Sequence, residues 1–341
     1  MKAYEPPLAL SASLLRLVGE ICERVGRLSV GGDSALTPQL RRDNRIRTIQ
    51  ASLAIENNTL SVEQVTAVLE GKRVLGLPRE IQEVRNAFRA YEYLPSWHPT
   101  SQLDLLAAHA SLMEGLIDDA GHFRQGGVGI YRGDQLLHMA PPANRVPTLV
   151  GQLLEWLGHT DWHPLLASCV FHYEFEFIHP FADGNGRMGR LWQTLILSRW
   201  NPLLAYLPVE TVIHAQQEAY YAALAEADHV AQATPFVDYM LRALLAAMDE
   251  VAQTEQVSDQ VTDQVNESVQ QLLQAFNKGE ALKSSEIMRR LGLSHRPTFR
   301  KNYLGPAIAS GLLEMTQPDS PRSPLQCYRL TDPGWRRRVS D

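Results

Sequence analysis

Apolar residues follow a helical repeat along most of the chain. In residues 1–30, Leu14, Val18, Ile21 and Val25 recur three or four positions apart, which predicts a helix with one buried face. The same repeat returns often enough to predict a mainly α-helical fold. The helices predicted in this way span 1–30, about 37–57, about 61–69, 79–93, 146–157, 165–177, about 187–199 and 235–250.

One stretch near residue 130 leaves the helical repeat for short β-prone runs. The runs 128–131 and 136–139 flank a Gly-Asp pair at 133–134, and Pro141-Pro142 follows them. Two such runs around a glycine-containing turn are typical of a β-hairpin. Proline ends the pattern because it has no backbone N–H to donate. The sequence therefore predicts a small hairpin within a helical body.

The last ninety residues differ from the body in composition. Residues 253–266 are polar and carry a short Asp-Gln-Val repeat, which indicates a linker that enters a helix. Two predicted helices between 284 and 313, with candidate strands at 311–315 and 328–330, are then typical of a winged helix-turn-helix domain. The predicted parts are an N-terminal helical region at 1–100, a core at 101–250, a linker helix at 251–278 and the winged-helix domain at 279–341.

Charge is distributed unevenly between these parts. Residues 279–341 hold 11 Lys and Arg against 6 Asp and Glu, a net charge of +5, whereas the whole chain carries −6, so the rest carries −11. A basic C-terminal module indicates contact with nucleic acid or with an acidic protein, and a merely solvated basic face is the alternative.

The composition also restricts the class of protein and the cellular compartment that we expect. No run of 18 apolar residues is present, so we expect no membrane span. The N-terminus has no apolar stretch behind a basic start, so no signal peptide is expected. The three cysteines are scattered without a paired motif, which favours neither a disulfide framework nor a zinc site and fits a cytoplasmic location.

The segment 177–190, Phe-Ile-His-Pro-Phe-Ala-Asp-Gly-Asn-Gly-Arg-Met-Gly-Arg, gathers features that suit an anion. Gly184 and Gly186 let backbone N–H groups approach a ligand closely. The helix predicted to follow turns its positive end toward the same place. Arg187 and Arg190 are three positions apart, so they share one face of that helix and can both reach phosphate groups.

Two further side chains of this segment add catalytic chemistry. Asp183 offers a hard oxygen ligand for a phosphate-bound Mg²⁺. Histidine ordinarily gains and loses a proton near neutral pH, so His179 can act as a base. A base, a metal ligand, an anion-binding loop and two guanidinium groups together predict attack on a nucleotide phosphate.

At every defined position this segment resembles the Fic motif, His-x-Phe-x-(Asp/Glu)-Gly-Asn-Gly-Arg-x-x-Arg. The resemblance to the Fic family covers about residues 1–250. It implies an adenylyltransferase that moves AMP from ATP to a Ser, Thr or Tyr hydroxyl of a protein, with pyrophosphate leaving. By this resemblance His179 deprotonates the hydroxyl, Phe181 anchors the loop and Asp183 holds Mg²⁺ against the phosphates.

The resemblance also implies where the nucleotide and the target bind. Asn185 would contact the phosphate under attack, and Arg187 and Arg190 the outer phosphates. The hairpin resembles the family's flap, which pairs with the target's backbone by strand addition. Tyr220-Tyr221 resembles a tyrosine pair near the family's adenine pocket. The implied nucleotide-binding residues are Gly184, Asn185, Gly186, Arg187, Gly189, Arg190 and Tyr220, and the implied target-binding residues are Val128, Gly129, Ile130 and Tyr131.

Residues 52–57 fit the family's inhibitory pattern, (Ser/Thr)-x-x-x-Glu-(Gly/Asn), at Ser52, Glu56 and Asn57. Ser52 and Glu56 are four positions apart, so they share one face of a predicted helix. By the resemblance, Glu56 pairs with Arg190 and occupies the space of the γ-phosphate, which leaves ATP in an unproductive pose. We therefore expect an autoinhibited enzyme.

The expected ligands are thus ATP and Mg²⁺, and the expected partner is a protein substrate, with self-modification included. A homodimer formed through the N-terminal helices and DNA contact through the winged helix stay open. Transfer of another nucleotide, removal of AMP, and a DNA-binding regulator that only senses nucleotide are the alternative functions. An intact His179 argues against the sensor, which has no need of a base.

Overall fold

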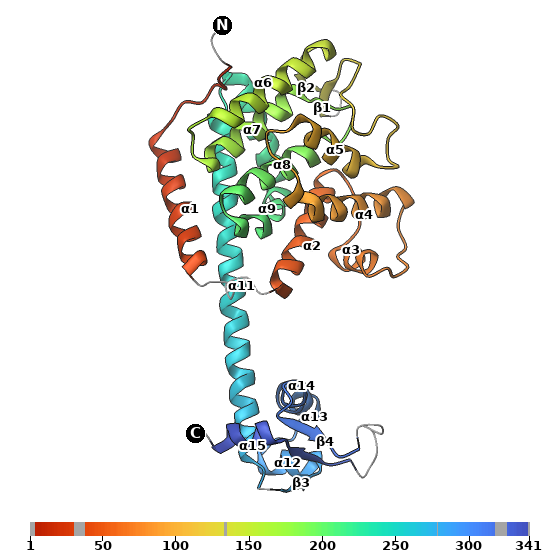
Figure 1. Ribbon diagram of the computed structural model, residues 1–341, viewed down its shortest axis with the longest axis vertical. Helices are drawn as coiled ribbons and strands as arrows, with labels where there is room; N and C mark the ends of the chain where they lie inside the picture. Colours follow the sequence, from red (N-terminus) through yellow and green to blue (C-terminus); the bar gives the residue numbers. More distant parts are fainter. Residues whose placement is uncertain (1–3, 31–37, 133–134, 278, 318–325, 340–341) are drawn as a thin grey trace. The chain divides into compact units, whose positions relative to one another are not determined.

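The computed structural model describes residues 4–30, 38–132, 135–277, 279–317 and 326–339 (Figure 1). Within these ranges the chain is mainly helical, which confirms the predicted fold class. The chain is divided into two compact units, Met1–Ala252 and Gln253–Asp341. No helix in the described ranges is both long and apolar enough to cross a membrane.

The first unit is built from helices around a small hairpin. The helix α11 begins in this unit and continues past its last residue. The helices are α1 Ala12–Val30, α2 Pro38–Ile55, α3 Val62–Leu69, α4 Pro78–Tyr93, α5 Gln102–Met113, α6 Val146–His159, α7 Pro164–Ile178, α8 Asn185–Trp200, α9 Val209–Ala215, α10 Gln217–Val230 and α11 Thr234–Gln274, with short 3-10 turns η2 Leu94–Ser96, η3 Ala143–Arg145 and η4 Pro202–Tyr206.

Three of these helices, α5, α9 and α10, were not predicted from the pattern of apolar residues. The helix α5 was missed because apolar residues lie on both of its faces: Leu105 and Leu112 are buried, whereas Leu103 is exposed. The helix α10 buries only Tyr220 and Ala227 along its length, and α9 is only two turns long. A helix with few buried apolar positions gives little periodic signal in its sequence.

The helices α7 and α8 form the centre of the first unit, and they pack against each other (Figure 1). Phe171 and Phe175 of α7 and Trp192 of α8 are fully buried. The helix α6 covers α7, whereas α2 and α5 contact α8. The loop 179–184, which joins the two central helices, is therefore held from several sides.

The predicted hairpin consists of β1 Gly129–Arg132 and β2 Gln135–Met139, paired antiparallel. Gly129 lies opposite Met139, and the register shifts between Ile130 and Tyr131, as at a β-bulge. The predicted turn at Gly133-Asp134 and the side chains of 130–138 lie outside the described residues.

The second unit has a hydrophobic core of its own, which includes Leu272, Phe276, Ile287, Phe299 and Leu304. Its strands form one antiparallel sheet in the order β3-β5-β4. The expected second helix is divided into three consecutive helical pieces. After α11 the elements are β3 Ala281–Leu282, α12 Ser284–Arg290, α13 Arg296–Phe299, a π-helical turn at Arg300–Leu304, α14 Gly305–Ala309, β4 Leu313–Met315, β5 Tyr328–Leu330 and α15 Asp332–Val339.

Candidate active site

The helix α7 ends at Ile178, and the next residue, His179, adopts the left-handed conformation with φ 48° and ψ 61°. Its backbone N–H still donates to the carbonyl of Phe175, so the change of direction falls directly after the helix. A non-glycine residue in this region is strained, and such strain persists where the surroundings hold the chain in place. The helix end therefore fixes the direction in which the His179 side chain leaves the backbone.

Arg124 is the group that holds this turn, and no motif in the sequence points to it. Its buried guanidinium donates to the carbonyl oxygens of Gly126, Pro141, Ile178 and His179, at 2.5–3.3 Å. These carbonyls belong to the turn at His179 and to the two ends of the hairpin segment. Arg124 therefore ties the hairpin and the His179 turn to one point.

Phe181 anchors the loop from below, as the resemblance implies. It is fully buried and stacks on the His109 ring at 3.6 Å between ring centroids. His109 Nδ1 accepts from the N–H of Gly121, so Nε2 carries the proton and donates to the carbonyl of Asp183. Burial lowers the pKa of His109 to about 4, which keeps the ring neutral in this bridging role.

The start of α8 forms the anion-binding part of the loop. Gly184 precedes the helix with φ 83°, and a side chain there would collide with Met113 Sδ. The Asn185 amide is 2 % exposed and exchanges two hydrogen bonds of 2.9 Å with the backbone of Phe181. Asn185 thus braces the loop, and the groups directed to an anion are the backbone N–H groups of the first helical turn.

Asp183 and Arg187 lie in a network of charges beside the loop. Arg187 is buried and pairs with Asp183 at 3.1 Å and with Glu83 at 3.4 Å. Arg79 contributes a third contact, to Asp183 at 3.2 Å. The Asp183 side chain stays 42 % exposed, so this carboxylate is accessible to a ligand.

Arg190 is buried, and both ends of the predicted inhibitory pattern contact it. Its Nε donates to Ser52 Oγ and its Nη2 to the Ser52 carbonyl, both at 3.0 Å, while Nη2 also donates to Glu56 Oε1 at 2.8 Å. Burial lowers the pKa of Arg190, but the Glu56 carboxylate outweighs this and leaves the pKa above its ordinary value. The sequence-predicted contact between residues 134 positions apart is therefore present.

The Glu56 carboxylate lies directly against the anion-binding turn. A Cβ atom added to Gly186 would stand 2.4 Å from Glu56 Oε1 and 3.1 Å from Arg190 Nη1. A Cβ atom added to Gly189, one turn later, would likewise stand 2.8 Å from Glu176 Oε1 and from His172 Cδ2. The Glu56 carboxylate beside Gly186 thus occupies the space that a negatively charged ligand of this turn would need.

Asn57 explains why the inhibitory pattern ends in glycine or asparagine. The helix α2 ends at Ile55, and Asn57 follows with φ 69°, a conformation that glycine and asparagine tolerate best. The N–H groups of Glu56 and Asn57 donate to Leu53 and Ala54, which closes the end of the helix. The turn therefore sets the position from which Glu56 reaches Arg190.

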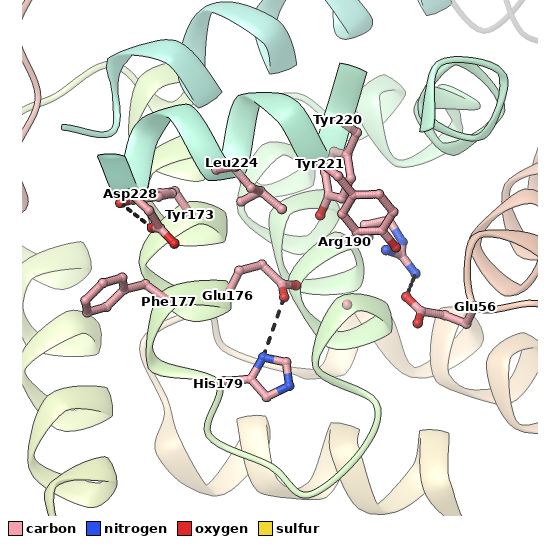
Figure 2. A pocket seen from close by; sticks show the side chains of 12 residues that line it. Glu56, Tyr173, Glu176, Phe177, His179, Arg190, Tyr220, Tyr221, Leu224 and Asp228 are labelled. Atoms are coloured by element: carbon pink, nitrogen blue, oxygen red, sulfur yellow. Dashed lines mark hydrogen bonds and ion pairs between the residues drawn. The ribbon is translucent and has the colours of Figure 1, made fainter. Parts of the chain in front are cut away.

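A pocket of about 180 Å³ brings these groups together. Figure 2 places the Glu56–Arg190 pair on one side of it, the Tyr173–Asp228 pair on the other, and Leu224 between them. Tyr220 and Tyr221, the predicted pair, both line the wall. The lining residues are Glu56, Tyr173, Glu176, Phe177, His179, Gly186, Arg190, Tyr220, Tyr221, Leu224, Ala225 and Asp228.

Glu176 is a second residue that sequence reasoning missed. Its carboxylate faces His179 Nδ1 at 4.0 Å and His172 Nε2 at 3.8 Å. Burial raises its pKa to about 7, with Arg190 acting in the opposite direction and Glu56 in the same one. Its position one turn before His179 was the only sequence signal available.

The described residues contain no group of three or more His, Cys, Asp or Glu that could hold a metal ion. Mg²⁺ in phosphate-transfer sites is commonly bound by one or two carboxylates together with substrate phosphates, so such a group is not required. The accessible Asp183 carboxylate beside the anion-binding turn fits that mode of binding. Its oxygens accept from Arg79, Arg187 and the N–H of Gly184, and these donors would share the carboxylate with a bound Mg²⁺.

Two family models match the chain. One, the Fic/DOC family, matches residues 99–197, and the other, the C-terminal domain of the Fic-like "Filamentation induced by cAMP" protein, matches residues 267–331. Among solved structures, a Fic family protein from Desulfovibrio desulfuricans G20 is 62% identical. The match covers 96% of this chain and 99% of that one, with a TM-score of 0.74.

More distant relatives match 71% or 72% of the chain. "Protein adenylyltransferase fic-1" of Caenorhabditis briggsae is 29% identical over 71% of this chain and 48% of its own length, and its Caenorhabditis elegans counterpart is 28% identical over the same shares. A solved structure of C. elegans Fic-1 shares the fold at 23% identity, covering 72% of this chain and 74% of that one, with a TM-score of 0.61. The chain spans about half the length of the curated relatives it matches.

Proposed function

This chain belongs to the Fic family, and from that premise we propose that it is a protein adenylyltransferase. It transfers AMP from ATP to a Ser, Thr or Tyr hydroxyl of a protein, including its own, and Glu56 inhibits it. One observation supports this above all. His179, Gly186 and Arg190 line one pocket, and Glu56 stands in that pocket against the two latter groups.

The proposed step is an attack of the target hydroxyl on the α-phosphorus of ATP. The O–H bond breaks and its proton passes to His179, a new O–P bond forms, and the bond to pyrophosphate breaks. Negative charge that develops on the phosphate oxygens faces the N–H groups at the start of α8, where the helix dipole is positive. Arg187 and Arg190 bind the outer phosphates.

In this proposal Asp183 would hold Mg²⁺ together with the phosphates. The metal ion would neutralise phosphate charge, as in other phosphate-transfer sites. Arg79 and Arg187 pair with Asp183 and keep the carboxylate at the rim of the turn. Substitution of Asp183 by Asn is expected to abolish the Mg²⁺ dependence of ATP binding.

The hairpin supplies the proposed contact with the protein substrate. A two-stranded sheet leaves one edge of each strand unpaired within that sheet, and an extended peptide can pair there. The carbonyl of Val128 accepts from Ala140, and Arg124 ties both ends of the segment to the His179 turn. A target bound along 128–131 would thus be held in fixed relation to the base.

Inhibition follows from the competition between Glu56 and a phosphate for the same groups. Arg190 is buried and already donates to Ser52 and Glu56. A γ-phosphate can take the place of Glu56 on Arg190 Nη2 only by displacing its carboxylate, which also fills the space beside Gly186. ATP bound with Glu56 in place would therefore lack its ordinary contact with Arg190.

The test uses wild type, Glu56→Gly and Glu56→Gly/His179→Ala, each incubated with Mg²⁺ and ATP labelled at the α- or the γ-phosphate. We expect protein labelling from the α-label only, strongest in Glu56→Gly and absent without His179. Labelling from other α-labelled nucleotides, or loss of AMP from pre-modified protein, would favour the alternative reactions. Bound ATP with no labelling in any variant would favour the sensor.

The C-terminal unit supports a second proposal, contact with duplex DNA through a winged helix. Arg296, Arg300 and Lys301 lie exposed on its central helical segment, and none of them forms a salt bridge within the described part of the chain. Basic residues of this kind bind phosphates and release counterions. Affinity for random duplex DNA should therefore fall steeply with salt, and a flat response would contradict the proposal.

A further inference from the structure

Glu176 lies on the last turn of α7, three residues before His179. Its Oε2 atom is 4.0 Å from His179 Nδ1, and Figure 2 shows the two side chains pointing toward each other. The carboxyl side chain is 13 % exposed and lines the pocket. A carboxylate in this position relative to a catalytic histidine can orient the ring and stabilise its protonated form.

A second histidine near this carboxylate, His172, cannot donate a hydrogen bond to it. His172 Nδ1 lies 2.6 Å from Gln193 Oε1, whose amide nitrogen donates to Cys169 Sγ, so Nδ1 carries the proton. Its Nε2 then accepts from the Tyr220 hydroxyl at 3.1 Å. Burial lowers the pKa of His172 to about 3, which keeps this ring neutral with no proton to offer Glu176.

His179 is therefore the histidine toward which Glu176 can act. We infer that Glu176 is a positioning residue, which accepts a hydrogen bond from His179 Nδ1–H and so presents Nε2 as the base. The inference rests on the proposed function. A separation of 4.0 Å exceeds a hydrogen bond, and catalytic hydrogen bonds of this kind often tighten only when substrate is bound.

This role keeps the charges of the step in balance. When the target hydroxyl gives its proton to His179 Nε2, the ring becomes a cation, and the Glu176 carboxylate behind it stabilises that charge. After pyrophosphate has left, the ring releases the proton to solvent and returns to its starting form. Glu176 itself exchanges no proton in the step.

Glu176 lies close to the pair formed by Glu56 and Arg190. The groups that face it are His172 and His179 on its own helix, Arg190 from α8, Glu56 at the end of α2, and Tyr220 and Tyr221 from α10. Glu56 raises the pKa of Glu176 and Arg190 lowers it. Removal of Glu56 therefore favours the ionised form of Glu176 that can hold His179.

The test compares Glu56→Gly with Glu56→Gly/Glu176→Gln. Glutamine keeps the size of the side chain but cannot carry the negative charge. We expect kcat to fall at least about tenfold, with KM for ATP changed less than about threefold. The acid side of the kcat–pH profile should lose one of its two ionisations. ¹⁵N NMR of the His179 ring should show the Nδ1–H form replaced in part by Nε2–H.

The matched control is Glu56→Gly/Glu174→Gln. Glu174 is a buried carboxyl two residues earlier on α7, where it accepts from the Tyr4 hydroxyl and does not line the pocket. This control should keep kcat, the pH profile and the His179 spectrum of the reference. An unchanged kcat and ring spectrum in the Glu176 variant, or equal losses in both variants, would overturn the inference. If the reference itself transfers no AMP, the proposed function fails, and the ring spectrum still decides the Glu176–His179 contact.

Discussion

Replacement of Glu56 by glycine is the most informative single change, because it removes the carboxylate that pairs with Arg190 beside Gly186. Glu56 follows the last residue of α2, so glycine there costs little helix stability. Arg190 keeps both hydrogen bonds to Ser52. The change therefore frees one N–H of the Arg190 Nη2 group and the space beside Gly186 without dismantling the rest of the site.

The size of the effect follows from the contact that is lost. The Glu56 side chain is one third exposed and accepts a hydrogen bond of 2.8 Å from the buried guanidinium of Arg190. A charge-assisted hydrogen bond of this kind contributes about 1.5–3 kcal/mol. At 1.4 kcal/mol for each factor of ten, AMP transfer should rise about 10- to 150-fold. The free energy of unfolding without ATP should fall by a similar amount, because Arg190 loses a partner.

The assay measures initial rates of protein labelling from α-labelled ATP for wild type, Glu56→Gln and Glu56→Gly. Glutamine keeps a hydrogen-bonding oxygen without the charge, so its rate should lie between the other two. Glu70→Gly is the matched control, because Glu70 also follows a helix and pairs with Lys72 at the surface, outside the pocket. Equal rates for wild type and Glu56→Gly, with ATP bound by both, would refute the reasoning.

Three further predictions concern the frame of the site. Arg124→Ala removes the donor shared by four carbonyl oxygens, so the free energy of unfolding should fall by about 3 kcal/mol or more in urea titrations; an unchanged midpoint would contradict this clamp. His109 and His172 have folded-state pKa values of about 4 and about 3, so only the unfolded chain binds these protons as pH falls below about 6.5. The free energy of unfolding should therefore decrease from pH 6.5 to 4, by up to about 1.4 kcal/mol per pH unit for each of the two histidines. A urea midpoint that does not change with pH would contradict the neutral, buried state of both rings. Asn57→Val places a β-branched residue at φ 69°, which should cost about 1–2 kcal/mol and raise labelling, whereas Asn57→Gly should match wild type in both.

Sequence patterns predicted those parts of the site whose residues are close together in the chain. The loop 179–190 could be interpreted because its glycines, arginines and histidine are adjacent and each residue type has a defined use there. The Ser52–Glu56 spacing could be interpreted for the same reason, since a four-residue interval on a helix places both side chains on one face. That Arg190 is their partner rested on the family resemblance, because nothing in the spacing links residues so far apart.

The side chains that hold the loop of the site in place could not be predicted from sequence patterns. Arg124 lies between predicted elements, and its function depends on four carbonyl groups that converge only in the folded chain. His109 stands on a helix that the apolar pattern missed, and its bridge from Gly121 to Asp183 joins distant segments. The two hydrogen bonds between the Asn185 amide and the Phe181 backbone were not predicted either. Tertiary contacts of this kind leave no periodic trace in a single sequence.

AMP transfer by His179 under inhibition by Glu56 can be detected by mass spectrometry of the Glu56→Gly protein after incubation with ATP and Mg²⁺. We expect an AMP adduct on a Ser, Thr or Tyr side chain of the enzyme or of an added target protein. The same adduct should be absent from Glu56→Gly/His179→Ala. A phosphate adduct, an adduct that forms without His179, or bound ATP with no adduct at all would contradict it.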